Sequence, residues 1–234
     1  AVADGLTVKT GYDYSSGKYG TNTTTEITSI PFMLNYETDV WTFKATLPYI
    51  HIKGANNVVS GIGATGGAAT GVRTESGLGD LTVAATRTLF MDTTNQMGFD
   101  LTGKIKFGTA DSDKGLGTGE NDYWILADAY RKIGAVTYFG GVGYGVLGDS
   151  PELKLKNVVS ANLGASYKLN PSASLGAVFD ARTKSTETGD PQRELTAFYM
   201  HKLEGGYKVQ AYAVKGFSDG SPDWGAGLNV GYNY

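Results

Sequence analysis

The chain ends in the stretch Trp224-Gly-Ala-Gly-Leu-Asn-Val-Gly-Tyr-Asn-Tyr234. Because successive side chains of a β-strand point to opposite faces, every second residue of this stretch shares a face. One face holds apolar and aromatic side chains from Trp224 to Tyr234, and the other holds only glycine and asparagine. An apolar face with aromatic residues at both ends is typical of strands that cross a membrane in a β-barrel. The stretch therefore predicts such a strand.

The composition excludes several classes of protein. The 234 residues include no cysteine, which excludes a disulfide scaffold, a cysteine-ligated metal site and thiol catalysis. The formal net charge is -3 and the lysines and arginines are dispersed, so no nucleic-acid partner is expected. No run of about 18 apolar residues exists, which excludes a transmembrane helix. A membrane barrel stays possible because its strands need only about 9 to 11 alternating residues.

The same two-residue alternation recurs along the whole chain. It is clearest at 41–49 and 97–107, where apolar or aromatic residues alternate with polar or small ones. Such alternation, bounded by turn residues, predicts strands. The predicted strands number twelve and cover residues 6–14, 29–36, 41–49, 80–89, 97–107, 123–130, 136–146, 159–168, 174–182, 195–203, 207–213 and 224–234.

The connections between these strands alternate in length. Tight turns, such as 37–39 and 170–171, alternate with longer connections, of which 53–76 is the longest and shows no strand pattern. Outer-membrane barrels have short periplasmic turns and longer extracellular loops. We therefore expect an all-β fold, in which residues 1–234 form a single transmembrane antiparallel β-barrel of twelve strands in the bacterial outer membrane, with both termini periplasmic. A soluble barrel or sandwich is the alternative, because the sequence does not reveal which face lies inside.

The polar face of the predicted strands would line the lumen of this barrel. Its charged residues are Lys9, Lys44, Asp80, Asp100, Lys104, Lys106, Asp128, Lys168, Asp180, Arg182, Lys202 and Lys208. Both signs of charge are present, so no strong selectivity for anions or cations is predicted. The glycines between them predict an interior that is not fully packed. Because twelve strands lie between filled eight-stranded barrels and open sixteen-stranded porins, we expect a narrow channel.

Aromatic residues gather at the strand ends, as in the interfacial girdles of membrane barrels. The predicted girdle consists of Tyr12, Tyr36, Trp41, Tyr167, Tyr207, Trp224 and Tyr234. Four further aromatic residues have the inward phase and would give the lumen apolar patches, namely Trp124, Phe139, Phe198 and Tyr212. Arg87 has the lipid-facing phase, and we expect its long side chain to reach the periplasmic headgroups.

The sequence offers little for catalysis or metal binding. Its two histidines, His51 and His201, are predicted at opposite ends of the barrel, with about 25 Å of apolar band between them. Ser60 and Ser76 flank the loop above His51, but no nucleophile-elbow pattern surrounds them. The G-x-G-x-x-G at 61–66 has no following helix and is not a dinucleotide site. We therefore predict no catalytic residue, metal or cofactor. A lipid- or lipopolysaccharide-modifying enzyme and an adhesive barrel are the alternatives.

The layout of twelve strands in hairpins resembles a family of outer-membrane channels associated with meta-pathway degradation of phenol and related aromatics. Two short motifs carry the resemblance, Ser76-Gly-Leu-Gly-Asp80 and Gly140-Gly-Val-Gly-Tyr-Gly145. It implies passive uptake of small, often hydrophobic molecules, through a lumen that we expect the inward-folded loop 53–76 to restrict. It also implies that Tyr234, where these barrels more often carry Phe, is part of the signal for the outer-membrane insertion machinery. The expected partners are this machinery, the lipid bilayer, lipopolysaccharide and a small-molecule solute, with the barrel a monomer.

Overall fold

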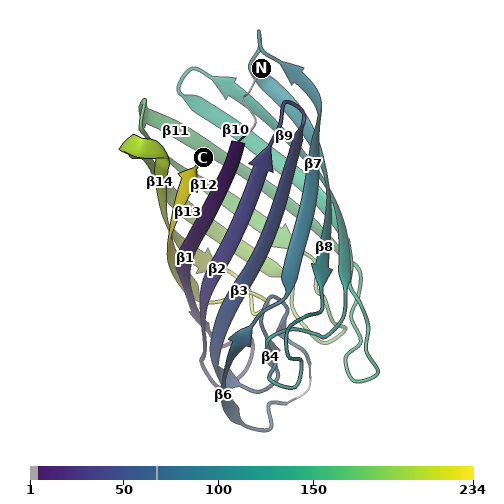
Figure 1. Cartoon of the computed structure of the whole chain (residues 1–234). Helices are drawn as coiled ribbons and strands as arrows, with labels where there is room; N and C mark the ends of the chain where they lie inside the picture. The colour runs from purple at the N-terminus through teal and green to yellow at the C-terminus, as the bar shows by residue number, and fades with distance from the viewer. Residues whose placement is uncertain (1–4, 67) are drawn as a thin grey trace.

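A computed structural model describes residues 5–66 and 68–234 of the chain. Thirteen strands form one antiparallel sheet that is rolled into a barrel (Figure 1). They are β1 (Gly5–Gly17), β2 (Thr25–Glu37), β3 (Trp41–Ala55), β6 (Val72–Leu78), β7 (Leu81–Asp92), β8 (Met97–Phe107), β9 (Asp122–Ile133), β10 (Val136–Val146), β11 (Val158–Asn170), β12 (Ala173–Arg182), β13 (Gln192–Lys202), β14 (Tyr207–Gly216) and β15 (Trp224–Asn233). Two short strands, β4 (Val58–Val59) and β5 (Gly63–Ala64), pair with each other.

The sheet closes because the first and last strands pair. β1 runs antiparallel to β15, from Thr7 opposite Asn233 to Ser16 opposite Trp224. β15 also pairs with β14, so the C-terminal stretch has a partner on each side. Closure leaves no row of unpaired backbone N–H and C=O groups, which a bilayer could not hydrogen-bond.

β6 and β7 occupy one position in the ring. Both pair with β3, β6 along its second half and β7 along its first half. The break between them lies opposite Pro48, whose oxygen accepts a hydrogen bond of 2.7 Å from the Gly79 N–H. A proline has no N–H to continue the ladder, which accounts for a break at this position. With β6 and β7 counted together, the thirteen strands give the predicted twelve.

The apolar face of the strands lies outside the barrel. In β1 the residues Leu6, Val8 and Tyr12 are exposed, while Thr7, Lys9 and Gly11, on the opposite face, are half-buried. The same holds across the ring, and on β10 and β11 the exposed fractions reach 60% for Val142 and 72% for Leu163. A soluble barrel would bury this face. The exterior therefore fits a bilayer, and the soluble alternative is wrong.

The two ends of the barrel differ. At one end, which we call the turn end, short connections join the strands, and both ends of the described chain lie there (Figure 1). One of these connections is a short 3-10 helix, η1 (Glu204–Gly206). At the opposite end, the loop end, the connections are long. No helix in the described residues is long and apolar enough to cross a membrane.

The prediction of a patternless loop over 53–76 was wrong at both of its ends. β3 continues to Ala55, and β6 begins at Val72 and pairs with this extension. The loop tip holds the β4–β5 hairpin. These strands extend past the apolar belt, where no lipid-facing side is required, so their sequences lack the alternation that marks the membrane strands.

The aromatic residues predicted for the girdle are mostly exposed, and their role as an interfacial girdle stays a prediction. Six of the seven predicted girdle residues have large exposed fractions, namely Tyr12, Tyr36, Tyr167, Tyr207, Trp224 and Tyr234. Trp41 is partly covered, because it stacks on Phe43 with a centroid distance of 5.7 Å and Arg87 lies 5.2 Å from its ring centroid. The aromatic ring thus holds the Arg87 guanidinium on the outer wall.

Candidate functional site: the lumen and its loop-end plug

The strand register places the charged residues that were predicted for the lumen on the inner face. Cross-strand partners share a face of the sheet, and Lys9, for example, lies opposite Met33 and Gly231, away from the exposed apolar residues. Asp80 lies in the break between β6 and β7 and forms an ion pair with Lys106 inside the barrel. That these residues line the path of a solute stays a prediction.

Inward aromatic rings lie against inward glycines of the neighbouring strands. A Cβ atom on Gly164 would stand 2.5 Å from Cζ of Phe139, and one on Gly145 would stand 2.7 Å from Cε2 of Trp124. Gly176 is covered in the same way by Phe198, and Gly227 by Tyr212. The glycine face therefore makes room for rings that lie along the wall. This arrangement accommodates bulky residues inside the barrel without their filling its centre.

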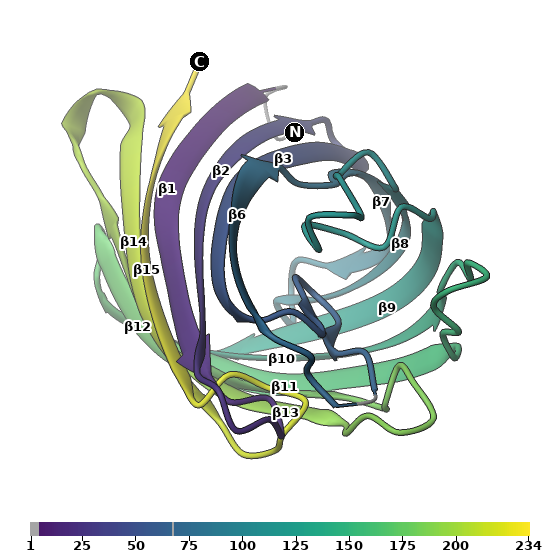
Figure 2. The same cartoon turned by 90° about the horizontal axis from the view of Figure 1, so that it is seen from below.

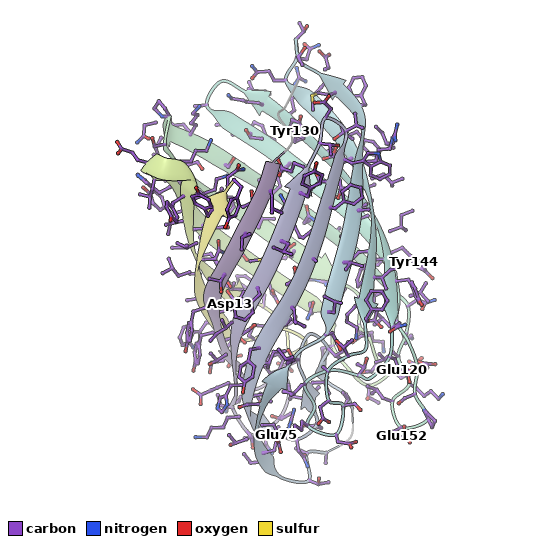
Figure 3. The ribbon with its side chains drawn as sticks, in the orientation of Figure 1. Asp13, Glu75, Glu120, Tyr130, Tyr144 and Glu152 are labelled. Atoms are coloured by element: carbon purple, nitrogen blue, oxygen red, sulfur yellow. The ribbon has the colours of Figure 1, made fainter. Side chains whose placement is uncertain are left out.

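Acidic residues occupy the middle of the lumen wall. Asp100 and Asp128 are direct cross-strand partners on β8 and β9, and Asp13 accepts a hydrogen bond from the Tyr212 hydroxyl. Figure 3 shows side chains along the whole barrel, with Tyr130 towards the turn end and Glu75, Glu120 and Glu152 at the loop end.

Two loops fold into the barrel at its loop end. Figure 2 shows them inside the ring, one between β3 and β6 and the other between β8 and β9. We call residues 56–66 and 108–121 together the plug. The backbone N–H of Ser60 in the first loop donates to the Gly115 oxygen in the second, with an N–O distance of 3.5 Å. The expectation that the first loop folds inward agrees with this arrangement.

Three small apolar clusters hold the plug against the wall. Leu116 and Ala110 pack on Ile50 and Ile52, which are inward residues of β3. The other two clusters hold the β4–β5 hairpin, one formed by Ile62, Leu147, Leu155 and Val158 and the other by Tyr19, Ala55 and Val58. Burial raises the pKa of Tyr19 to about 12.

Arg73 on β6 joins the two loops of the plug. Its Nη1 and Nη2 donate to the backbone oxygens of Ala55 and Val58, each at 2.6 Å, and its Nε donates to the Lys114 oxygen at 3.0 Å. From the opposite wall, Nη1 of Arg182 donates to the Gly61 oxygen at 3.2 Å. Sequence reasoning missed Arg73 because it assigned this residue to a loop.

Lys106 joins the base of the plug to the barrel wall. Its Nζ lies 3.1 Å from an oxygen of Asp80 and 3.1 Å from an oxygen of Asp122, and all three side chains are largely buried. Asp80 also accepts from the Ala110 N–H at 3.0 Å, and Asp122 accepts from the Gly148 N–H at 2.9 Å. Lys106 and Asp80 thus neutralise each other as part of a structural network.

Unpaired lysines surround two pockets inside the turn end. One pocket of about 240 Å³ is lined by Lys132, Lys168 and Lys202. The other, of about 360 Å³, is lined by Lys9, Lys202 and Lys208. Among the described residues, none of these five lysines forms an ion pair within 4 Å. Sequence reasoning missed Lys132 because it ended the predicted strand at residue 130, whereas β9 continues to Ile133.

The two histidines lie at opposite ends, as predicted. His51 on the outer face of β3 hydrogen-bonds through Nδ1 to the hydroxyl of Ser76 on β6, at 2.6 Å. His201 near the turn end bonds through Nδ1 to the Tyr199 hydroxyl at 2.8 Å. Among residues 5–66 and 68–234, no group of three or more histidines and carboxylates is placed to hold a metal ion.

The closed sheet, its apolar exterior and its polar, partly open interior define a β-barrel of the outer-membrane class. Solved structures with this fold match nearly the whole chain. An outer membrane channel from Pseudomonas putida F1 is 14% identical, has a TM-score of 0.73, and the match covers 100% of this chain and 97% of that chain. The predicted likeness to twelve-stranded outer-membrane channels is confirmed as a likeness of fold.

Two porins share the fold at lower similarity. The NanC porin is 9% identical with a TM-score of 0.60, and the match covers 97% of this chain and 98% of that chain. The KdgM porin, solved in complex with disordered oligogalacturonate, is 7% identical with a TM-score of 0.55 and the same coverage. No protein-family model and no curated protein matches the chain. The three structures are of channels or porins, not of enzymes.

Proposed function

We propose that this barrel is an outer-membrane channel for the passive diffusion of small molecules, including hydrophobic or aromatic compounds. The observation that carries the proposal is the interior. Its side chains are polar, its aromatic rings lie against glycines such as Gly164 and Gly227, and pockets of about 240 and 360 Å³ open inside the turn end. A barrel with a purely structural role has no need of such space.

In this proposal the turn end faces the periplasm and the loop end faces the outside. Support comes from the connection lengths, because short turns are periplasmic and long loops extracellular in barrels of this class. Both termini are then periplasmic, and the plug lies at the external mouth. Tyr234, whose N–H donates to the Leu6 oxygen at 2.9 Å, stands at the turn end, where we expect the insertion machinery to read it.

The plug acts as the restriction of this channel. Its contacts are three small apolar clusters and a few hydrogen bonds at the aqueous end of the barrel. Segments held by few buried contacts open at a smaller free-energy cost than the sheet does. Solutes enter when the hairpin of β4 and β5 moves from the lumen.

Liposome swelling tests the proposal. Liposomes that contain the purified protein are diluted into solutions of sugars, amino acids and neutral monoaromatics, and the same is done with a variant in which 57–65 is replaced by a short Gly-Ser linker. We expect slow swelling for the natural chain and faster swelling for the variant, with the smallest solutes fastest. If neither protein admits any solute, the channel function is wrong.

One contact favours a second candidate, an enzyme that modifies lipid or lipopolysaccharide. His51 and Ser76 are bonded at 2.6 Å on the outer wall near the loop end, where a lipid headgroup could reach them. A hydrolase would use the imidazole as base for the serine. Among the described residues, no carboxylate is recorded as bonded to His51 to orient it. Ester hydrolysis by the natural protein that His51→Ala and Ser76→Ala each abolish would establish this activity, whereas a channel is unaffected by either change.

A further inference from the structure

The lysines at the turn end come from both sides of the chain's closure, on β9, β11, β13, β14 and β1. Lys202 and Lys208 are direct cross-strand partners on β13 and β14, and Lys208 and Lys9 both lie opposite Gly231 of β15. Neighbouring strands are about 4.8 Å apart, so Lys202, Lys208 and Lys9 occupy one row across four strands. Like charges placed directly opposite each other destabilise a sheet. Their placement therefore calls for a reason other than stability.

The surroundings of these lysines are rich in hydrogen-bond donors and contain little negative charge. The smaller pocket is also lined by hydroxyl groups, including those of Thr137, Ser166, Ser172 and Ser174. Among the residues that the structure describes, Glu37 is the one carboxylate side chain that lines either pocket, and it accepts a hydrogen bond from Asn35 at 2.8 Å. The acidic pair Asp100 and Asp128 lines neither pocket. Ammonium and hydroxyl donors together suit an anion.

We propose that Lys9, Lys132, Lys168, Lys202 and Lys208 form an anion vestibule that attracts and binds small organic carboxylates inside the turn end. The inference rests on the proposed channel function and names the solute class that it favours. The pocket volumes are at or below the lower end of the range for ligand sites, about 300 to 1,000 Å³, which suits a small carboxylate. The apolar contacts of the plug suit the rest of such a solute.

The vestibule changes the expectation of ion selectivity. Both signs of charge occur along the lumen, and at the loop end Lys106 pairs with both Asp80 and Asp122. At the opposite end five lysines line two pockets, and among the described residues none of the five has an ion-pair partner. A cleft lined by one sign of charge raises the local concentration of counter-ions by tenfold or more. We therefore expect preference for anions.

Planar-bilayer recordings under a KCl gradient test this expectation. We expect the natural channel to be about tenfold more permeable to chloride than to potassium at low salt, with the preference declining as salt rises because charges are screened. The test variant carries Lys168→Gln, Lys202→Gln and Lys208→Gln, and its permeability ratio should fall towards one. A cation-preferring natural channel, or an unchanged ratio in the variant, would overturn the vestibule.

A matched control removes the same charge from elsewhere. Lys18, Lys53 and Lys215 are exposed lysines at the loop end, outside the vestibule. The triple variant Lys18→Gln, Lys53→Gln and Lys215→Gln should keep the natural permeability ratio. If the control loses anion preference as much as the test variant does, the selectivity comes from overall charge and the vestibule is wrong.

Binding of fluorobenzoate, followed by ¹⁹F NMR in detergent micelles, separates the vestibule from the channel function. The natural protein should broaden the fluorobenzoate signal, the neutral fluorobenzamide should show much less effect, and the Lys168, Lys202 and Lys208 variant should lose at least tenfold in affinity. Absence of conductance together with this binding pattern would refute the channel and retain the vestibule. Equal binding of the acid and the amide, or of the natural protein and the variant, would refute the vestibule itself.

Discussion

Removal of the Arg73 side chain should open the plug. Its guanidinium donates four hydrogen bonds to backbone oxygens, those of Ala55, Val58, Lys114 and Gly115, and these belong to or flank both plug loops. The Arg73→Ala variant loses all four at once. The β6 strand itself should persist, because its pairing with β3 uses backbone groups.

The free energy that the closed plug loses in this variant depends on what replaces the lost hydrogen bonds. A hydrogen bond with a charged partner contributes about 1.5–3 kcal/mol. The freed oxygens lie near the aqueous loop end, where water satisfies most of them, so we count one such bond instead of four. A loss of about 2 kcal/mol corresponds to a roughly 30-fold rise in the population of the open plug. Single-channel recording should show this as a higher open probability of the full-conductance state.

Arg193 provides the matched control. It also donates to backbone oxygens, those of Arg182 and Gln192, at 3.3 and 2.8 Å, and within the part of the chain that the structure describes none of its side-chain hydrogen bonds reaches the plug. Arg193→Ala should leave the open probability at the natural value. An unchanged open probability in Arg73→Ala, or an equal rise in both variants, would refute the assignment of Arg73 as the residue that joins the plug.

Further predictions concern the wall, the buried ion pairs and pH. Gly164→Ala should push the Phe139 ring from the wall, reducing single-channel conductance and destabilising the barrel to urea by about 1–3 kcal/mol, whereas Gly103→Ala should be neutral because no atom lies within 4 Å of the added Cβ. Lys106→Met leaves its two buried aspartates unpaired and should cost about 3–5 kcal/mol in urea unfolding, with recovery when both are changed to Asn. Burial raises the pKa of Tyr19 to about 12 from an ordinary value near 10. The free energy by which the neutral Tyr19 hydroxyl stabilises the closed plug is therefore fully present below pH 10 and declines above it. Open probability should rise between pH 10 and 12 in the natural channel, and Tyr19→Phe should reduce that rise; an identical profile would contradict the role of this hydroxyl.

The strand pattern was readable from the sequence where lipid imposes it. The ranges 97–107 and 136–146 coincide with β8 and β10, because each residue there faces either lipid or the interior and the alternation is strict. At the loop end this constraint is absent. The extension of β3 to Ala55 and its pairing with β6 were therefore invisible in the pattern.

The candidate site was predictable in part. The inward phase of residues such as Lys9 and Lys168 followed from alternation, since the side-chain period of a strand is two. The alternation did not show which residues of other strands and loops would lie beside them. Arg73 contacts Lys114, and His51 contacts Ser76, only because separate strands and loops meet in the folded barrel.

By itself, the C-terminal stretch from Trp224 determined a strand with one apolar and one small, polar face, because alternation is a local property of the backbone. Only the tertiary structure decided which face lies inside, since closure of β15 on β1 places the apolar face outward. It also decided what the glycines do. Gly227 makes room for the Tyr212 ring, and Gly231 separates Lys208 from Lys9 in the anion vestibule. Register across strands brings these residues together, and register is a property of the closed sheet.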